Sequence, residues 1–101
     1  MNITEIFRIS QPAYNRINDG KHDSYDNFWF ATMDDTQCNQ SGKLYMLTPD
    51  LQLYEMYSNF IIGNGLDWSN CGKFIYFTYS IRRVIYRFEI NYCLKKLYNK
   101  K

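Results

Sequence analysis

The sequence NGLDWSNCGKFIYFT at residues 64–78 decides the fold, because the chain carries it in two versions. The other version is NDGKHDSYDNFWFAT at residues 18–32, placed 46 residues earlier. Each version has an asparagine, a nearby glycine, a polar turn and an apolar strand that ends in threonine. A period of roughly 40–50 residues that carries β-strands is typical of a propeller blade. The repeat therefore predicts blades of antiparallel sheet.

Composition limits the chain to a small folded unit. Its 101 residues allow at most one domain. Apolar residues make up 46% and aromatic residues 19%, which excludes compositional disorder and favours strands. The net charge of +2 is too small to indicate nucleic-acid binding, so no nucleic-acid partner is expected.

No targeting or membrane-spanning segment is visible. No apolar run reaches signal-peptide length at the N-terminus, and none approaches the roughly 20 residues of a membrane span. Cys38, Cys71 and Cys93 are odd in number and have no Cys-x-x-Cys spacing, so neither a disulfide framework nor a zinc site is expected. Reduced thiols, a cytoplasmic location and no membrane partner are the expectation.

Alternation and turn residues predict about two blades of antiparallel sheet. Strands are expected at residues 3–9, 28–33, 43–48, 51–57, 74–78 and 84–90. Turns are expected at Asp19-Gly20, residues 23–27, Pro49-Asp50 and residues 69–72. Residues 94–101 hold a run of lysines and are interpreted as a solvated basic tail. No stretch has a helical period of more than two turns.

Five motifs carry a resemblance to a known family, and they follow one another in that family's order. They are RINDGKHD (16–23), FATM (30–33), GKLYMLTPD (42–50), NGLDWSNCGKFIYFT (64–78) and VIYRFEI (84–90). Over residues 11–92 the chain resembles the regucalcin/gluconolactonase family, which includes the senescence marker protein and the luciferin-regenerating enzyme. The resemblance implies an all-β fold: residues 1–101 would be a β-propeller fragment, a partial domain with about two four-stranded antiparallel blades of a six-bladed propeller.

The resemblance also implies site residues. Asn64 falls on a metal ligand of the family, and Arg16 and Asn18 fall on residues that contact the substrate. An amide oxygen suits a hard cation such as calcium, and an arginine and an amide can hold lactone hydroxyls. Calcium is the expected metal, with zinc, manganese and magnesium as alternatives. No catalytic residue is assigned, because the family's glutamate and aspartate ligands have no counterpart here.

The chain departs from the family pattern at three further positions, and the proposed site residues also have purely structural interpretations. Ala31, Thr36 and Tyr79 replace a glycine, a glutamate and an aspartate of the family. From the residues alone, Asn64 and Asn18 would equally serve as turn residues and Arg16 as a surface arginine. The remaining residues of interest are expected to be structural: Asp23 and Asp67 as turn acceptors at matching repeat positions, Trp29 and Trp68 as packing between blades, and His22 without a metal or catalytic role.

Two functions are therefore expected. One is a fragment of a calcium- or other divalent-metal-dependent sugar lactonase, acting on a small-molecule sugar lactone. The other is a non-catalytic calcium-binding protein or an inactive truncated relative. Because two blades leave open faces, three states are considered: a truncated product, a partner chain that supplies further blades, or a homotrimer that closes a ring.

Overall fold

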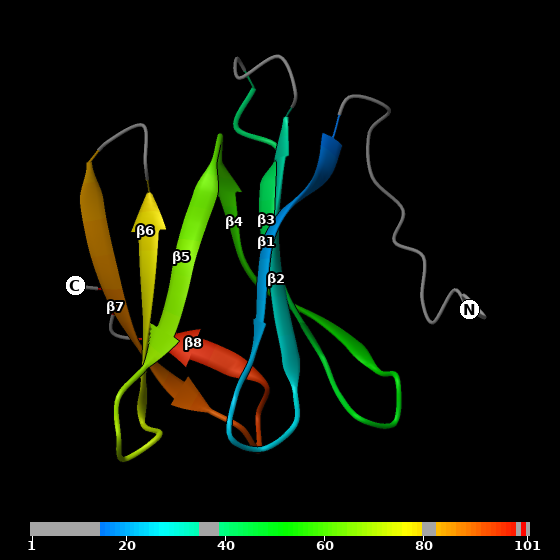
Figure 1. Ribbon diagram of the computed structural model, residues 1–101, viewed down its shortest axis with the longest axis vertical. Coiled ribbons are helices and arrows are strands. Elements are labelled where there is room, and N and C mark those ends of the chain that lie inside the picture. The colour runs from blue at the N-terminus through cyan, green and yellow to red at the C-terminus, as the bar shows by residue number, and fades with distance from the viewer. Residues whose placement is uncertain (1–14, 35–38, 80–82, 99, 101) are drawn as a thin grey trace, which may run out of the picture.

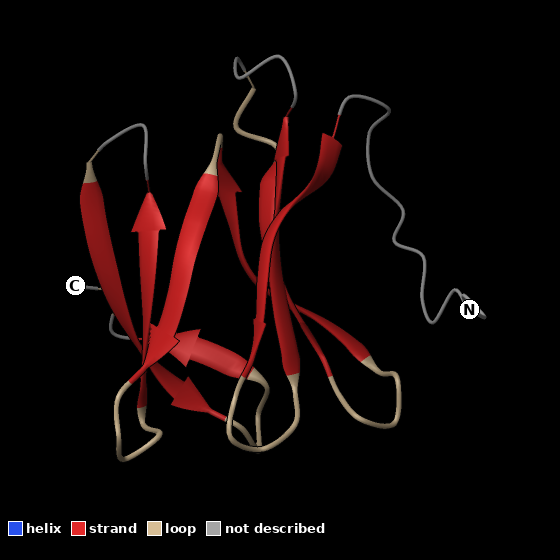
Figure 2. Ribbon diagram, in the orientation of Figure 1, coloured by secondary structure: helices blue, strands red, loops and turns tan. Residues whose placement is uncertain are grey.

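Two four-stranded sheets make up the part of the chain that a computed structural model describes, residues 15–34, 39–79, 83–98 and 100 (Figure 1). Every regular element among those residues is a strand, which confirms the all-β prediction (Figure 2). The predicted strand at residues 3–9, Thr36 and Cys38 lie outside the described residues. No helix in the described part is long and apolar enough to cross a membrane.

Each sheet is an antiparallel meander. The first, blade 1, has the order β1-β2-β3-β4, from β1 (Asn15–His22), β2 (Phe28–Asp34), β3 (Gly42–Leu47) and β4 (Leu53–Phe60). The second, blade 2, has the order β5-β6-β7-β8, from β5 (Gly63–Trp68), β6 (Phe74–Tyr79), β7 (Val84–Asn91) and β8 (Lys96–Tyr98). The predicted propeller fragment of two blades is confirmed.

The sequence predicted a turn at the dipeptide Asp19-Gly20, but both residues are part of β1. Gly20 pairs with Phe30, and the ladder is interrupted only by a bulge between Ile17 and Asp19. A Cβ at Gly20 would meet the ring of Phe28 at 2.6 Å, so the glycine makes room for that ring. Pairing with β2 has overridden the local turn preference of Asp-Gly.

In blade 2, the pairing between the first two strands is shifted by one residue from the pairing that the 46-residue repeat predicts. Trp29 lies opposite Lys21, whereas Asp67, the repeat counterpart of Lys21, lies opposite Tyr76. The turn explains this: the Asp23 amide donates to the Asn27 carbonyl, while the Ser69 amide donates one residue further on, to Phe74. Trp29 therefore corresponds to Tyr76, and Asp23 corresponds to Ser69 rather than to Asp67 as predicted.

The core lies between the blades. Trp29, Leu44 and Met46 of blade 1 are buried together with Ile75, Phe77 and Phe88 of blade 2. Phe60, at the end of β4, contacts Phe77 edge-on with ring centroids 5.0 Å apart. Trp29 and Trp68 meet at 6.1 Å, so their predicted role in packing between blades is confirmed.

Part of the predicted solvated tail is structured. β8 pairs with the end of β7, where Leu97 lies opposite Ile90. Lys100 lies over the rings of Tyr57 in β4 and Tyr86 in β7, at 5.4 and 4.7 Å. This lysine thus stacks on aromatic rings of both blades, a favourable contact for a cation.

The buried carboxylate of Asp23, in the turn between β1 and β2, joins the two blades. Asp23 accepts hydrogen bonds from the amides of Tyr25 and Asn27, which confirms its prediction as a turn acceptor. Its Oδ2 also accepts from Trp29 Nε1 at 2.8 Å and from the Tyr92 hydroxyl of blade 2 at 3.2 Å. These donors compensate the burial of the charge.

Replacement of Leu44 by alanine tests the packing between blades. Leu44 is 0% exposed and Leu94, in the turn before β8, is 64% exposed. We expect Leu44→Ala to lower the free energy of unfolding by about 2–5 kcal/mol and Leu94→Ala by less than about 0.5 kcal/mol. Urea unfolding followed by tryptophan fluorescence measures both, and equal losses in the two variants would contradict this core.

The pairing of Tyr92 with Asp23 predicts a pH dependence. Burial, and then the neighbouring carboxylate, raise the pKa of Tyr92 above its ordinary value. In the unfolded chain this hydroxyl ionises near about pH 10, while the folded chain retains the proton, so stability falls as the pH rises through that range. Unfolding free energies at about pH 8 and 11 should fall less in Tyr92→Phe than in the unchanged chain. The exposed Tyr98→Phe should keep the full slope, and an unchanged slope in Tyr92→Phe would refute the linkage.

Candidate functional site

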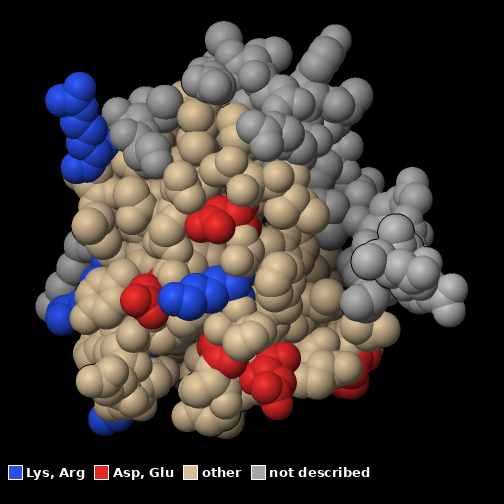
Figure 3. All heavy atoms as spheres, in the orientation of Figure 1, with Lys and Arg blue, Asp and Glu red and all other residues tan. Residues whose placement is uncertain are grey.

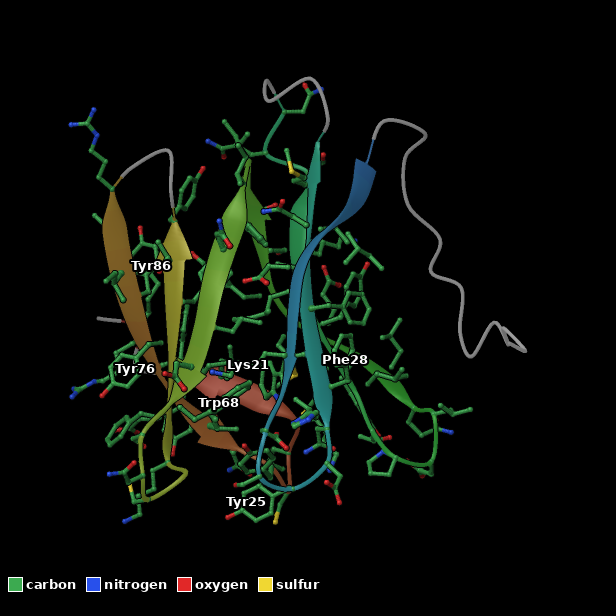
Figure 4. All side chains as sticks on the ribbon, in the orientation of Figure 1. Lys21, Tyr25, Phe28, Trp68, Tyr76 and Tyr86 are labelled. Atoms are coloured by element: carbon green, nitrogen blue, oxygen red, sulfur yellow. The ribbon has the colours of Figure 1, made fainter. Side chains whose placement is uncertain are left out.

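The candidate site lies where β1 and β5, the two strands that carry the repeated asparagines, run side by side. Lys21 Nζ in β1 is 3.4 Å from Asp67 Oδ1 in β5, and Asp19 Oδ2 accepts a hydrogen bond from the Gly65 amide at 2.9 Å. Both pairs are 46 residues apart, so repeat counterparts touch each other. Figure 3 shows acidic and basic side chains close together on this face, and Figure 4 shows Lys21 between the two strands.

Asn18 lies at the bulge of β1 and contacts blade 2. Its Nδ2 donates to the Gly63 carbonyl at 2.9 Å, and the side chain is half-buried. Because Gly63 directly precedes Asn64, this bond fixes Asn18 beside the segment that carries the predicted metal ligand. The structure therefore places Asn18 against the residue that precedes Asn64.

Asn64 is an exposed residue of β5, opposite Thr78. Its Oδ1 accepts from the Gly65 amide at 2.9 Å. Of Gly63, Asn64 and Gly65, Gly65 alone takes a positive φ, of 63°. The turn-residue interpretations of Asn18 and Asn64 are thus wrong, because both lie in strands. Asn18 is the unpaired residue at the bulge of β1, whereas Asn64 pairs with Thr78 just before the bulge of β5.

Arg16 lies in β1 opposite Met33, two residues before Asn18. Its side chain is outside the described part of the chain, so its predicted substrate contact stays a prediction. Sequence analysis missed Asp19, which bonds the amides of Gly20 and Gly65 and so fixes the bulge after Asn64. The sequence feature that could have revealed this contact is the spacing between Asp19 and Gly65, which equals the repeat of 46 residues.

Asp67 has a different role from Asp23. The backbone amide of Trp68, and then Lys21, lower the pKa of Asp67 by stabilising its ionised form. The carboxylate is exposed and serves as the counterion of Lys21. It thus stays charged at the face shared by β1 and β5.

The described residues do not by themselves fit a complete divalent-cation site. Among residues 15–34, 39–79, 83–98 and 100, no group of three or more His, Cys, Asp or Glu residues is placed to hold a metal ion. Calcium takes six to eight oxygen ligands. Asn64 offers one amide oxygen, and that oxygen already accepts the Gly65 amide.

Comparison with known sequences identifies relatives. A family model for the SMP-30/gluconolactonase/LRE-like region matches residues 1–101. A regucalcin from Bos taurus is 30% identical over 92 residues, which cover 86% of this chain and 31% of the relative. An uncharacterised protein from Sulfolobus acidocaldarius is 34% identical over 77 residues, 76% of this chain and 28% of the relative.

Solved structures show the same arrangement of strands. A luciferin-regenerating enzyme matches with a TM-score of 0.81 and 33% identity, over 87% of this chain and 30% of that chain. A calcium-binding regucalcin from Agrobacterium tumefaciens matches with a TM-score of 0.77 and 19% identity over the same shares, which shows the fold alone. The chain thus spans about 30% of the length of these relatives.

Replacement of Asn18 tests its contact with blade 2. Asn18→Ala removes the bond to the Gly63 carbonyl and should lower the free energy of unfolding by about 1 kcal/mol. Asn70→Ala, in the exposed turn after β5, should change it by less than about 0.5 kcal/mol. Urea unfolding measures both. A loss no larger than that of Asn70→Ala would mean that the bond does not hold the blades together.

Proposed function

This chain belongs to the SMP-30/gluconolactonase/LRE-like family, and we propose that it forms part of a divalent-metal-dependent sugar lactonase. The observation that carries the proposal is the bond from Asn18 to the Gly63 carbonyl, which holds Asn18 beside Asn64. Family membership supports the chemical class, and this contact supports assigning Asn18 and Asn64 to one site near β1 and β5.

In this proposal Asn18 and Arg16 contact the sugar lactone. The Asn18 amide and the Arg16 guanidinium suit lactone hydroxyl and carbonyl oxygens, which accept hydrogen bonds. Asp19 positions the segment around Asn64 through the Gly65 amide. No residue of the described part is assigned as the base that activates water.

Asn64 supplies one amide oxygen to the metal. Calcium is the proposed ion, since one relative in the structural comparison is a calcium-binding regucalcin. Because the described residues do not complete a cation site, the remaining ligands must come from outside them, and no step of hydrolysis is assigned to the ion here.

Metal titration and a lactone assay on the 101-residue chain test the proposal. Calorimetry with Ca²⁺, Mg²⁺, Mn²⁺ and Zn²⁺ should show binding that Asn64→Ala weakens at least about tenfold and that Asn70→Ala leaves unchanged. Release of acid from gluconolactone should exceed the uncatalysed rate only with metal, and should fall in Asn64→Ala and Asn18→Ala. Metal binding without turnover would favour the non-catalytic calcium-binding role, and neither binding nor turnover would refute both functions for the 101-residue chain itself.

A further inference from the structure

Both peptide groups that flank Asn64 are hydrogen-bonded to blade 1. The Gly63 carbonyl, on the N-terminal side of Asn64, accepts from Asn18 Nδ2 at 2.9 Å. The Gly65 amide, on the C-terminal side, donates to Asp19 Oδ2, also at 2.9 Å. Asn18 and Asp19 are adjacent in β1, so a single dipeptide of blade 1 holds the backbone before and after the proposed metal ligand.

The bulges of the two strands make these contacts possible. Asn18 is the extra residue at the bulge of β1, and Gly65 is the extra residue at the bulge of β5. The extra residue of a bulge is left out of the ladder of its own sheet, so its polar groups can bond elsewhere. Here the Asn18 side chain and the Gly65 amide both bond across the blades, one on each side of Asn64.

The Gly65 amide has two acceptors. Asn64 Oδ1 lies 2.9 Å from the same nitrogen that donates to Asp19 Oδ2. One N–H cannot point directly at both oxygens, and a carboxylate is a stronger acceptor than a side-chain amide. The bond to Asn64 is therefore the one that the Gly65 amide loses at lower cost.

The backbone after Asn64 needs a bond from outside β5. Gly65 has a φ of 63°, and a Cβ there would lie 3.0 Å from Thr78 Oγ1, so glycine suits the position. Glycine is also the residue with the greatest backbone freedom. The bond to Asp19 restricts that freedom and gives the peptide group after Asn64 one orientation.

The carboxylate of Asp19 is itself fixed at both oxygens. Its Oδ1 accepts from the Gly20 amide of β1 at 3.0 Å, while Oδ2 accepts from the Gly65 amide of β5. A group bonded in this way to two strands has a defined orientation. Such bonded groups behind a metal ligand are what orient the ligand in metal sites.

From these contacts we propose that Asp19 is a positioning residue, which keeps the Gly65 amide bonded while Asn64 Oδ1 turns from that amide to a divalent cation. The oxygen proposed to bind the cation already accepts the Gly65 amide, and Asp19 removes this conflict because it can take over the bond. Asn64 then exchanges partners without a change in the backbone. The identity of the ligand rests on the proposed function, whereas the contacts around Asn64 do not.

Hydrogen exchange of the Gly65 amide, followed by NMR of the ¹⁵N-labelled chain without added metal, tests which acceptor holds it. Asp19→Ala should speed this exchange at least about fivefold, because it removes the stronger bond. Asn64→Ala should speed it less than about twofold, because Asp19 remains. Asp67→Ala, which removes a carboxylate bonded to the Trp68 amide in the same strand, should also change it less than about twofold.

The opposite order of effects would overturn the proposal: an acceleration in Asn64→Ala that equals or exceeds the one in Asp19→Ala. Asp19→Asn keeps the shape of the side chain and one acceptor oxygen, and it replaces Asp19→Ala in the test if the alanine variant loses the tryptophan fluorescence of the folded chain. Exchange no faster in Asp19→Asn than in Asn64→Ala would then be the contrary result.

A Ca²⁺ titration monitored at the Asn64 side-chain amide tests the exchange of partners. The Asn64 resonances should shift with Ca²⁺ while Gly65 exchange stays within about twofold of its rate without metal. Asp19→Ala should weaken this binding about tenfold, and Asp67→Ala, which removes an equal charge from the same pair of strands, less than about twofold.

The outcomes of the titration separate the two proposals. Equal affinities in Asp19→Ala and Asp67→Ala would overturn the positioning role of Asp19 and leave metal binding intact. An unchanged chain whose Asn64 resonances do not respond to any of Ca²⁺, Mg²⁺, Mn²⁺ or Zn²⁺ would refute metal binding by this chain, while the Gly65 exchange rates still decide whether Asp19 holds the amide.

Discussion

The packing of one sheet face against another is the interaction on which the rest of this structure depends. Four short antiparallel strands form a sheet with two faces, and neither sheet can cover its own apolar side chains. Trp29, Leu44 and Met46 are buried because Ile75, Phe77 and Phe88 lie across from them. The crossing from β4 to β5, through Phe60, sets how the second sheet meets the first.

The sequence predicted the kind of element and five of the eight strands in the described part of the chain, but it missed β1, β5 and β8 and the register between the blades. Two apolar strands that end in threonine favour an alignment of Thr32 with Thr78, but the ladders show a shift of one residue. The longer turn from Ser69 to Phe74 absorbs the extra residue, with Gly72 at a positive φ of 75°. Both faces of these strands are apolar, so no alternation of polar residues revealed the shift.

The candidate site was predictable from resemblance, but not from local structure. Asn18 and Asn64 were found through their motifs, and the structure places Asn18 beside the Asn64 segment. Asp19 was missed because Asp-Gly favours a turn in an isolated peptide. Only the pairing of β1 with β2, and the bond from the Gly65 amide across the blades, show that this dipeptide is strand and that its carboxylate supports the neighbouring blade.

The differences between the two blades have a physical pattern. Stacked repeats place equivalent residues in contact, so a charged residue copied without change would meet its own charge at every step. The change from Lys21 to Asp67 turns that repulsion into an ion pair. A second difference concerns the face of blade 2 that points away from blade 1: Tyr76 and Arg87 stand where blade 1 has Trp29 and Met46, and Arg87 lies over the ring of Phe74. Such amphipathic side chains suit a sheet face that is exposed to water, because each keeps a polar end in solvent while its apolar part lies on the sheet.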